Sequence, residues 1–187
     1  MKNAHQPLVI LDRDGVINQD SDSYIKSPDE WIPIEGSLEA IAKLTQAGYQ
    51  VVVCTNQSGI SRGLFDTDTL NAMHEKMHAL LARFGGEINA IFFCPHTDED
   101  ECNCRKPKTG MFEEIAKRFN LDKSLLGVPV VGDSLRDLIG PVTLGAEPHL
   151  VLTGKGTKTR EKGGLPPYTA VHTNLAAFVH HFLNVAK

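Results

Sequence analysis

The chain has 187 residues, of which 41% are hydrophobic, and its formal net charge at pH 7 is -4. This length suits one well-buried core, and a negative charge without any lysine or arginine run argues against nucleic acid as a partner. We find no apolar stretch of about 18 residues and no signal-peptide core before Pro7, so we expect a cytoplasmic protein with no membrane partner.

Five short apolar runs predict β-strands. They lie at residues 8–11, 49–54, 90–93, 128–131 and 149–152. Most of them do not alternate with polar residues, which is typical of parallel strands covered on both faces. Helical patterns separate the runs. The sequence therefore predicts an α/β protein with a doubly wound, mostly parallel sheet and helices on both faces.

The first helix is expected after the first strand. Ser37 is a candidate N-cap, Leu38, Ile41 and Leu44 supply an apolar stripe, and Gly48 ends the pattern.

Three further helices are expected, at 68–84, after a cap at Thr109, and at 174–185. Their apolar faces include Leu70, Met73, Met77, Leu80, Leu81 and Phe84 in the first and Met111, Phe112, Ile115 and Phe119 in the second. The segment 154–168 is rich in glycine, lysine and proline and is expected to be a mobile surface connection. No insertion is large enough for a cap domain, so the site should be open or covered only by loops.

Polar side chains follow three of the predicted strands, where ligands bind in open α/β sheets. Asp12 and Asp14 follow the first strand, and residues two apart in an extended segment can face one ligand. The second strand runs into Thr55, Asn56, Gln57 and Ser58. The fourth runs into Asp133, with Asp137 four residues later.

Arg105 and Lys106 add positive charge to these carboxylates. Carboxylates alone would bind only a metal, whereas lysine, arginine and turn amides beside them form a site for an anion held together with Mg²⁺. Phosphoryl transfer is the chemistry this favours, because positioning and charge neutralisation do most of its work. One carboxylate can act as nucleophile, while a second protonates the leaving alkoxide and deprotonates the attacking water.

Four ordered motifs resemble those of the haloacid-dehalogenase-like (HAD) phosphatases: Asp12-Arg13-Asp14-Gly15, Thr55-Asn56-Gln57, Lys106 and Gly132-Asp133-Ser134. The resemblance covers nearly the whole chain and implies one phosphatase domain over residues 1–187. It implies Asp12 as nucleophile, Asp14 as general acid/base, and Thr55 and Lys106 as phosphate clamps. It also implies a catalytic Mg²⁺ bound by Asp12, Asp133 and the backbone carbonyl of Asp14.

The segment 94–104 is a candidate zinc-binding loop. Its ligands would be Cys94, His96, Cys102 and Cys104, three thiolates and an imidazole that can form a closed tetrahedral set. Four protein ligands leave no open position, so we expect a structural zinc. Disulfides are the alternative, and they suit a reducing compartment less well. Cys54, alone in a predicted strand, is expected to be a small buried apolar residue.

A second zinc pattern lies in the helix expected at 68–84. His74-Glu75-Lys76-Met77-His78 matches the H-E-x-x-H signature of metalloproteases. The helical pattern puts His74 at the margin of the core face, and no third ligand follows at a recognisable spacing. Histidines of an amphipathic helix are therefore the favoured interpretation. His180 and His181 are expected to be solvated.

Within the HAD phosphatases, a Cys/His loop followed by Arg-Lys-Pro resembles two branches, the D-glycero-D-manno-heptose 1,7-bisphosphate 7-phosphatases and the histidinol-phosphate phosphatases. The segment 55–65, the lack of a cap and the Lys-Thr-Gly-Met-Phe after the loop favour the heptose branch. The short spacing between His96 and Cys102 is closer to the alternative, and Ser134 replaces a lysine typical of many heptose enzymes.

The heptose branch implies a monomeric enzyme, a sugar bisphosphate substrate and a step in nucleotide-activated heptose synthesis for lipopolysaccharide. The substrate contacts carried over from it are Asp20, Ser21, Asp22, Ser23, Asn56, Gln57, Ser58, Arg105 and Lys106. A non-catalytic phosphate-binding module with the same fold is a further alternative, which the intact Asp12 and Asp14 disfavour.

Overall fold

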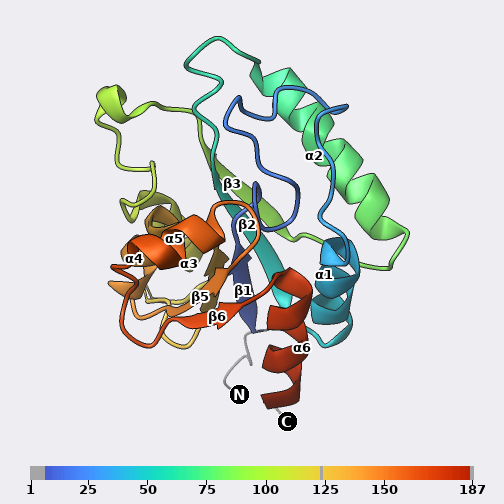
Figure 1. Ribbon diagram of the computed structural model, residues 1–187, viewed down its shortest axis with the longest axis vertical. Helices are drawn as coiled ribbons and strands as arrows, with labels where there is room; N and C mark the ends of the chain where they lie inside the picture. Colours follow the sequence, from blue (N-terminus) through green and yellow to red (C-terminus); the bar gives the residue numbers. More distant parts are fainter. Residues whose placement is uncertain (1–6, 123, 186–187) are drawn as a thin grey trace.

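The computed structural model describes residues 7–122 and 124–185. Its sheet has six strands in the order β3-β2-β1-β4-β5-β6 (Figure 1). The strands are β1 (Leu8–Leu11), β2 (Gln50–Asn56), β3 (Ala90–Cys94), β4 (Pro129–Gly132), β5 (Glu147–Val151) and β6 (Ala170–His172). Each neighbouring pair is parallel. The doubly wound parallel sheet predicted from the sequence is confirmed.

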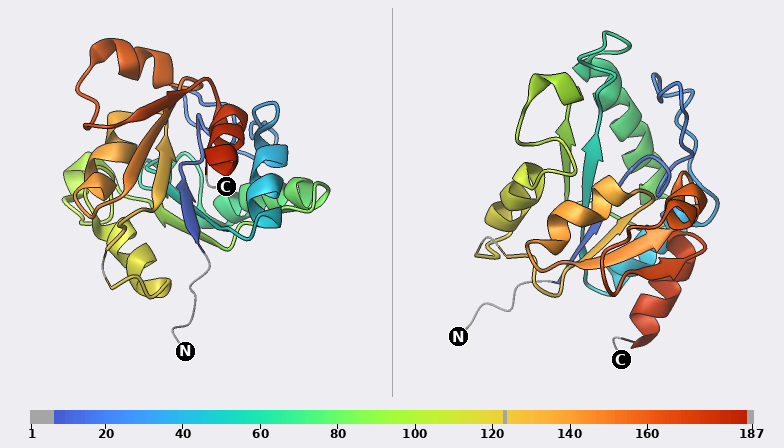
Figure 2. Two further views of the ribbon diagram at one scale, coloured as in Figure 1. Left: turned by 90° about the horizontal axis from the view of Figure 1, so that it is seen from below. Right: turned by 60° about the vertical axis from the view of Figure 1, so that its left-hand side comes forward.

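Helices cover both faces of this sheet (Figure 2). The helices α1 (Ser37–Gln46), α2 (Thr67–Ala82) and α6 (Leu175–Val185) lie on one side, and α3 (Gly110–Arg118), α4 (Leu135–Val142) and α5 (Gly156–Lys162) on the other. A short 3-10 turn, η1 (Asp98–Asp100), follows β3. The expectation of helices on both faces is confirmed.

Two apolar cores follow from the alternation of side chains along β1. Val9 and Leu11 pack in a cluster with residues of α1, α2 and α6, whereas Leu8 and Ile10 pack in a cluster with residues of α3. Successive strand residues point to opposite faces, so every β1 side chain is buried only if both faces are covered. This explains why the strand is apolar throughout.

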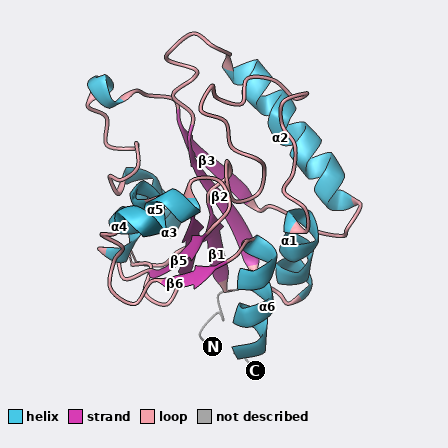
Figure 3. Ribbon diagram, viewed as in Figure 1, coloured by secondary structure: helices cyan, strands magenta, loops and turns pink. Residues whose placement is uncertain are grey.

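The chain reverses its direction of winding at β1, which pairs with β2 on one edge and β4 on the other. Loops gather beyond the carboxyl ends of the strands (Figure 3). Ligands of open α/β sheets bind at such a switch point. The long segment between β1 and α1 belongs to this group of loops.

The five predicted strands are found within two residues at each end. Helix α1 begins at Ser37, but Gly36 is its N-cap residue with a φ of 79°, so the prediction of Ser37 as the cap is wrong. The Ser37 hydroxyl instead donates to the carbonyl of Ile17 over 2.6 Å. Gly48, with a φ of 86°, follows the end of the helix as expected.

Helix α2 ends at Ala82, so Phe84 lies beyond it and is 42% exposed rather than part of the buried face. Asp66 caps the helix by accepting from the amide of Thr69 at 2.8 Å. Thr109 is the N-cap residue of α3, although its hydroxyl donates to Glu113 and makes no capping bond to the backbone.

Apart from the short turn η1, three elements were not expected from the sequence. They are α4, which begins two residues after Asp133, α5, which lies inside the segment 154–168 expected to be a surface connection, and the three-residue edge strand β6. Within residues 7–122 and 124–185, every helix is too short or too polar to serve as a transmembrane span.

Candidate active site

A crevice of about 300 Å³ opens above the carboxyl ends of β1 and β2. It brings together residues from the loops that follow several strands. Its lining comprises Asp12, Asp14, Asp20, Ser21, Asp22, Tyr24, Ile25, Thr55, Asn56, Gln57, Ser58, Arg62, Asp98, Arg105, Lys106, Arg136 and Lys155. All but one of the predicted catalytic and substrate-binding residues therefore line one cavity. Ser23 is exposed in the same loop, and its neighbour Tyr24 lines the crevice instead.

Three buried carboxylates form the floor beside this crevice. Oxygen atoms of Asp12, Asp133 and Asp137 all lie within 4.8 Å of one another. Burial and the nearby Asp137 raise the pKa of Asp12 to about 6, and burial with Asp137 and Asp12 raises the pKa of Asp133 to about 8. Lys106 supplies one positive charge to these three carboxylates, and a divalent cation would supply the remainder. Hard oxygen donors fit Mg²⁺.

Lys106 lies between two of these acids. Its Nζ is 3.0 Å from Asp12 Oδ1 and 2.8 Å from Asp137 Oδ1, and it donates to the carbonyl of Cys54 at 2.7 Å. Although burial opposes the charged form of Lys106, Asp12 and Asp137 raise its pKa, so the lysine is an ammonium ion. Asp137 was noted from the sequence only for its spacing and was not among the predicted site residues.

Asn56 fixes the backbone of Lys106 in place. Its side chain donates to the Lys106 carbonyl and accepts from the Lys106 amide, each at 3.0 Å. These two bonds join the end of β2 to the segment after the zinc loop, 50 residues further on. Because both polar atoms of the Asn56 side chain bind this backbone, Asn56 contributes to the crevice by orienting Lys106.

Asp14 turns its carboxylate away from the acidic floor. Oδ1 accepts from Arg13 Nε and from Asn18 Nδ2, and Oδ2 accepts from Arg13 Nη2 and Gln57 Nε2, at distances of 2.8 to 3.1 Å. Burial would raise the pKa of Asp14, but the Arg13 charge and these hydrogen bonds outweigh it and lower the pKa. The carboxylate is absent from the acidic cluster, which leaves only its backbone carbonyl for the predicted metal contact.

Gln57 and Thr55 complete this side of the crevice. Gln57 Nε2 also donates to Thr55 Oγ1 at 2.9 Å, so the glutamine bridges the threonine and Asp14. Both residues are buried. The turn after β2 thus positions one predicted phosphate clamp and the predicted acid/base through a single side chain.

Two glycines enclose Asp133. A β-carbon added to Gly15 would lie 2.1 Å from Asp133 Oδ2, and one added to Gly154 would lie 2.2 Å from the same atom. Both have positive φ, 84° and 55°. The close approach also lets the amide of Lys155 donate to Asp133 Oδ2 at 2.8 Å. The turns after β1 and β5 therefore hold the carboxylate from two sides.

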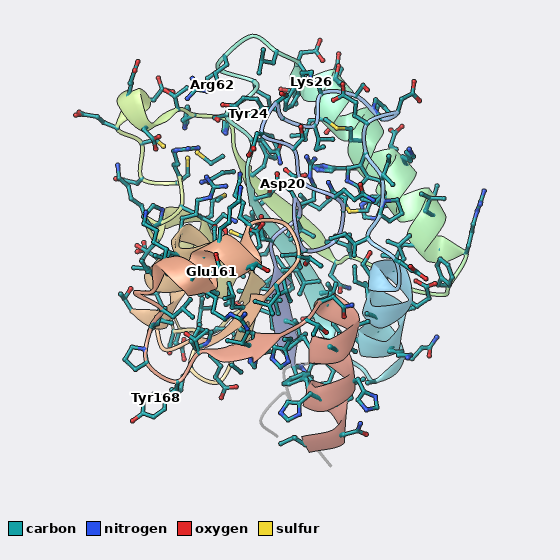
Figure 4. The ribbon with its side chains drawn as sticks, viewed as in Figure 1. Asp20, Tyr24, Lys26, Arg62, Glu161 and Tyr168 are labelled. Atoms are coloured by element: carbon teal, nitrogen blue, oxygen red, sulfur yellow. The ribbon has the colours of Figure 1, made fainter. Side chains whose placement is uncertain are left out.

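Charged residues surround the mouth of the crevice. Arg105 donates from Nε to Asp98 Oδ1 at 2.6 Å and from Nη1 to the carbonyl of His96 at 3.2 Å. Lys155 pairs with Asp20 across the opening at 3.1 Å. Figure 4 shows Asp20, Tyr24 and Arg62 at the end of the molecule where the loops gather, whereas Tyr168 projects from the opposite end.

The predicted zinc ligands come together in space. Cys94 Sγ lies 2.9 Å from Cys104 Sγ and 3.7 Å from Cys102 Sγ, and His96 Nδ1 lies 3.3 Å from Cys104 Sγ. The four atoms lie within 4.8 Å of one another, and all the cysteines are free thiols, so the disulfide alternative is not adopted. This donor set fits tetrahedral Zn²⁺. Cys54 is separate, buried in β2, as expected.

The H-E-x-x-H pattern has another use. His74 is buried and its Nε2 lies 3.2 Å from Arg13 Nη1, whereas His78 is exposed. Among the described residues, neither histidine belongs to a group of three candidate metal ligands. His180 and His181 are exposed on α6 as predicted. The residues of this hydrogen-bonded network that were not predicted as site residues are Arg13, Asn18, His74 and Asp137. Only the place of Arg13 inside the first motif and the spacing of Asp137 from Asp133 could have indicated them from the sequence.

Two family models match the chain. A model described as polynucleotide kinase 3 phosphatase matches residues 8–134, from β1 to the residue after Asp133. A model described as HAD-hydrolase-like matches residues 103–178. The two matches together span the acidic floor, the candidate zinc ligands and Lys106.

Curated relatives and solved structures match nearly the whole chain. A D-glycero-beta-D-manno-heptose-1,7-bisphosphate 7-phosphatase of Bordetella bronchiseptica is 59% identical over 96% of this chain and 99% of the relative. The protein of that name from Neisseria meningitidis is 57% identical over 94% of each chain. The crystal structure of the B. bronchiseptica D,D-heptose 1,7-bisphosphate phosphatase, complexed with magnesium and phosphate, superposes with a TM-score of 0.93 at 58% identity, covering 96% of this chain and 99% of that one.

A parallel sheet with a buried cluster of aspartates and a lysine at its switch point, matched by these models, defines a phosphatase of the HAD-like hydrolases. The chain belongs to the family of the D-glycero-beta-D-manno-heptose-1,7-bisphosphate 7-phosphatases.

Proposed function

We propose that this chain hydrolyses the 7-phosphate of D-glycero-β-D-manno-heptose 1,7-bisphosphate, a step toward nucleotide-activated heptose. The observation that carries the proposal is the convergence of Asp12, Lys106 and Asp133 at one crevice in a chain 59% identical to a relative bearing that name. The relatives favour this substrate over histidinol phosphate. An intact set of reactive carboxylates disfavours a non-catalytic binding module.

Asp12 is the nucleophile in this proposal. A carboxylate oxygen attacks the phosphorus, a bond forms between Asp12 and the phosphoryl group, and the bond from phosphorus to the sugar oxygen breaks. The Lys106 ammonium, 3.0 Å from Asp12 Oδ1, and the Thr55 hydroxyl stabilise the negative charge of the transferred group. Buried charges with fixed neighbours need little rearrangement during the reaction.

Asp14 handles the protons. The step requires the protonated form of Asp14, which donates its proton to the leaving sugar oxygen. The resulting carboxylate accepts a proton from the water that attacks the phosphoryl-aspartate, which releases phosphate and restores both Asp12 and the protonated Asp14. Its side chain lines the crevice while Arg13, Asn18 and Gln57 fix its orientation. Asp20, Ser21, Asp22 and Ser58, which line the crevice, are proposed to contact the sugar, and Ser23, which is exposed in the same loop, stays a predicted contact.

Two metals have separate roles in this proposal. Asp12, Asp133 and the backbone carbonyl of Asp14 would hold Mg²⁺, which when bound neutralises phosphate charge in the transition state. Cys94, His96, Cys102 and Cys104 would hold a structural Zn²⁺ within the loop 94–104. Because Arg105 and Lys106 follow Cys104 directly, zinc in that loop would fix the start of the segment that aims both side chains.

The test is turnover by purified protein of a panel containing heptose 1,7-bisphosphate, heptose 1-phosphate and histidinol phosphate. We expect phosphate release from the bisphosphate at the 7-position, which ³¹P NMR identifies. Asp12→Asn should fold normally and keep less than a tenth of the wild-type rate, since losing a nucleophile costs far more than the about 1.4 kcal/mol that a tenfold change represents. A mutant above that limit rules out the aspartyl-phosphate route.

Arg105 is proposed to select the bisphosphate. It lies at the mouth of the crevice, where a guanidinium can pair with the second phosphate and repel the ammonium group of histidinol phosphate. We expect kcat/KM to favour the heptose bisphosphate by at least about 100-fold, or about 2.7 kcal/mol. Arg105→Ala should erase much of this preference and leave hydrolysis of a small phosphate ester intact. Comparable turnover of histidinol phosphate by the wild type would overturn the assignment.

The remaining expectations from the sequence stay predictions. They are a single domain over residues 1–187, a monomer in solution, a cytoplasmic location and no partnership with nucleic acid or membranes. Sedimentation at micromolar concentration tests whether the protein is a monomer. The proposed substrate supports the cytoplasmic location, since nucleotide-activated sugars are made where nucleotides are available.

A further inference from the structure

Arg13 is a fully buried arginine inside the first motif. Its Nε and Nη2 bind the two carboxylate oxygens of Asp14, and Nη2 also donates to Gln57 Oε1 at 3.3 Å. A buried guanidinium needs partners for its donors, because each unpaired one costs free energy. On this side its partners are all members of the site already described.

The opposite nitrogen, Nη1, reaches a different element. His74 Nε2 on α2 lies 3.2 Å from it, and within residues 7–122 and 124–185 this is the hydrogen-bond partner found for Nη1. A guanidinium only donates, so Nε2 must accept, which fixes the imidazole as neutral with its proton on Nδ1. Burial and the Arg13 charge lower the pKa of His74 to about 3, in agreement with a neutral ring.

We propose that His74 is a positioning residue for the reaction: its Nε2 anchors the Arg13 guanidinium, which in turn holds the Asp14 carboxylate. The inference rests on the proposed role of Asp14 as general acid/base. Because the guanidinium is rigid and planar, fixing Nη1 also fixes the plane in which Nε and Nη2 bind Asp14. Helix α2 thus influences the proton transfers although His74 does not line the crevice.

The pattern of slowed reaction steps can identify this positioning role of His74, because only some steps need Asp14. Loss of the anchor leaves substrate contacts in place, so kcat should fall while KM stays nearly constant. The steps differ in sensitivity, since 4-nitrophenolate leaves without a proton whereas a sugar alkoxide requires one. Attack by water on the phosphoryl-aspartate requires a base with either substrate.

Two amide variants differing by one methylene provide the matched comparison. In His74→Gln the side-chain oxygen can reach the position of Nε2, and in His74→Asn it is too short to do so. His78→Asn, on the exposed face one turn later, is the control for the loss of an α2 histidine. Asp14→Asn reports the full loss of the acid/base, and Asp12→Asn tests the nucleophile independently.

We expect His74→Asn to lower kcat for heptose 1,7-bisphosphate at least about tenfold with KM within about threefold, and His74→Gln to stay within about threefold of wild type. With 4-nitrophenyl phosphate, His74→Asn should give a rapid burst of about one nitrophenolate per active site, followed by slow turnover. Wild-type rates in His74→Asn, or a burst slowed as much as the steady state, would overturn the proposal.

A measurement on the unmodified protein covers the case in which His74→Asn does not fold. Long-range ¹⁵N–¹H NMR of the His74 ring should show an unprotonated Nε2 and a protonated Nδ1, and the reverse tautomer would overturn the proposal. If His74→Asn is unaffected while Asp12→Asn and Asp14→Asn are inactive, the proposed function stands and this inference fails. If Asp14→Asn retains full activity, Asp14 is not the general acid/base, and the inference about His74, which rests on that role, is overturned with it.

Discussion

At the scale of single residues, the site contains a buried group of three charges, formed by Lys106 and the carboxylates of Asp12 and Asp137. Asp137 is fully buried, and its two oxygens have different partners, Lys106 on one side and the Ser134 amide and hydroxyl on the other. Burial would raise the pKa of Asp137, but the charges of Lys106 and Arg136 outweigh it and lower the pKa. Asp137 is therefore a second negatively charged partner of Lys106, so the ammonium group is shared between Asp137 and Asp12.

We predict that Asp137→Asn lowers both activity and stability. Lys106 would lose one of its two charged partners in a buried place, which should cost about 2 kcal/mol of unfolding free energy. Its Nζ would then shift toward Asp12 and weaken that carboxylate as a nucleophile, so kcat should fall at least about tenfold. Urea unfolding and steady-state kinetics measure the two effects.

Ser134→Ala is the matched control, because it removes only a hydroxyl that donates to the other oxygen of Asp137 at 2.7 Å. It should cost about 1 kcal/mol and leave kcat within about threefold of wild type. Equal losses of kcat in the two variants would contradict the role assigned to the ion pair between Asp137 and Lys106.

At the scale of elements, the zinc loop is expected to behave as a local folding unit. Cys102→Ser removes one of four ligands, so zinc content should fall from about one per chain to near zero and the midpoint of thermal unfolding should drop by several degrees. Cys54→Ala is the control, since Cys54 lies in β2 and is not one of the four clustered ligands, so this variant should retain zinc. Zinc-free wild-type protein prepared under reducing conditions would contradict the site.

The β5–β6–α6 corner is expected to be sensitive to acid. His149 Nδ1 lies 3.1 Å from His172 Nε2, and the ring packs against Phe178. Burial, with the neighbouring His172 and His181, lowers the pKa of His149 to about 4. The unfolded chain protonates this residue near pH 6.5, so the stability it contributes is fully present above that pH and is lost as the pH falls toward 4.

His149→Asn should therefore flatten the dependence of the unfolding free energy on pH between 6.5 and 4.5 relative to wild type. The shorter amide can still meet His172 but cannot ionise. His180→Asn, which changes an exposed histidine of the same corner, should leave the slope unchanged. Denaturant unfolding at four or five pH values is sufficient, and parallel slopes for wild type and His149→Asn would contradict the expectation.

The elements that could be predicted from the sequence are those with a clear apolar pattern. The strands β1 to β5 and the helices α1, α2, α3 and α6 have apolar runs or stripes, which tertiary contacts reinforce. Helix α4 is only eight residues long and contains Pro141, and α5 is a short polar helix without a stripe, so neither pattern was distinct. The edge strand β6 has three residues, too few for any periodicity.

The site shows the same division. The identities and order of Asp12, Thr55, Lys106 and Asp133 pointed to one cavity, because the carboxyl ends of parallel strands meet. The orientation of Asp14 could not be predicted, since it depends on a buried arginine. Arginine side chains are seldom fully buried, so the sequence does not predict that Arg13 lies buried between His74 on α2 and Gln57 after β2.

At the scale of the whole molecule, the two metals should separate activity from folding. Brief chelation of Mg²⁺ should abolish turnover reversibly and leave far-UV circular dichroism unchanged, because the acidic floor belongs to a fold held by two apolar cores. Restoring Mg²⁺ to about 100 times its dissociation constant should stabilise the protein by about 2.7 kcal/mol. Asp133→Asn should lose most of that stabilisation, and zinc content measured in parallel shows that the loop was not stripped.

The enclosure of Asp133 by Gly15 and Gly154 limits how sequences of this fold can vary. Each position requires a positive φ, and an added methyl group would overlap a carboxylate oxygen. Compensation is difficult, because relieving one overlap moves a backbone turn against the other, with the Gly15 Cα only 2.6 Å from a β-carbon at Gly154. In a library of all single substitutions, these two positions, 139 residues apart, should tolerate change as poorly as the aspartates, although neither glycine has a side chain to offer a ligand.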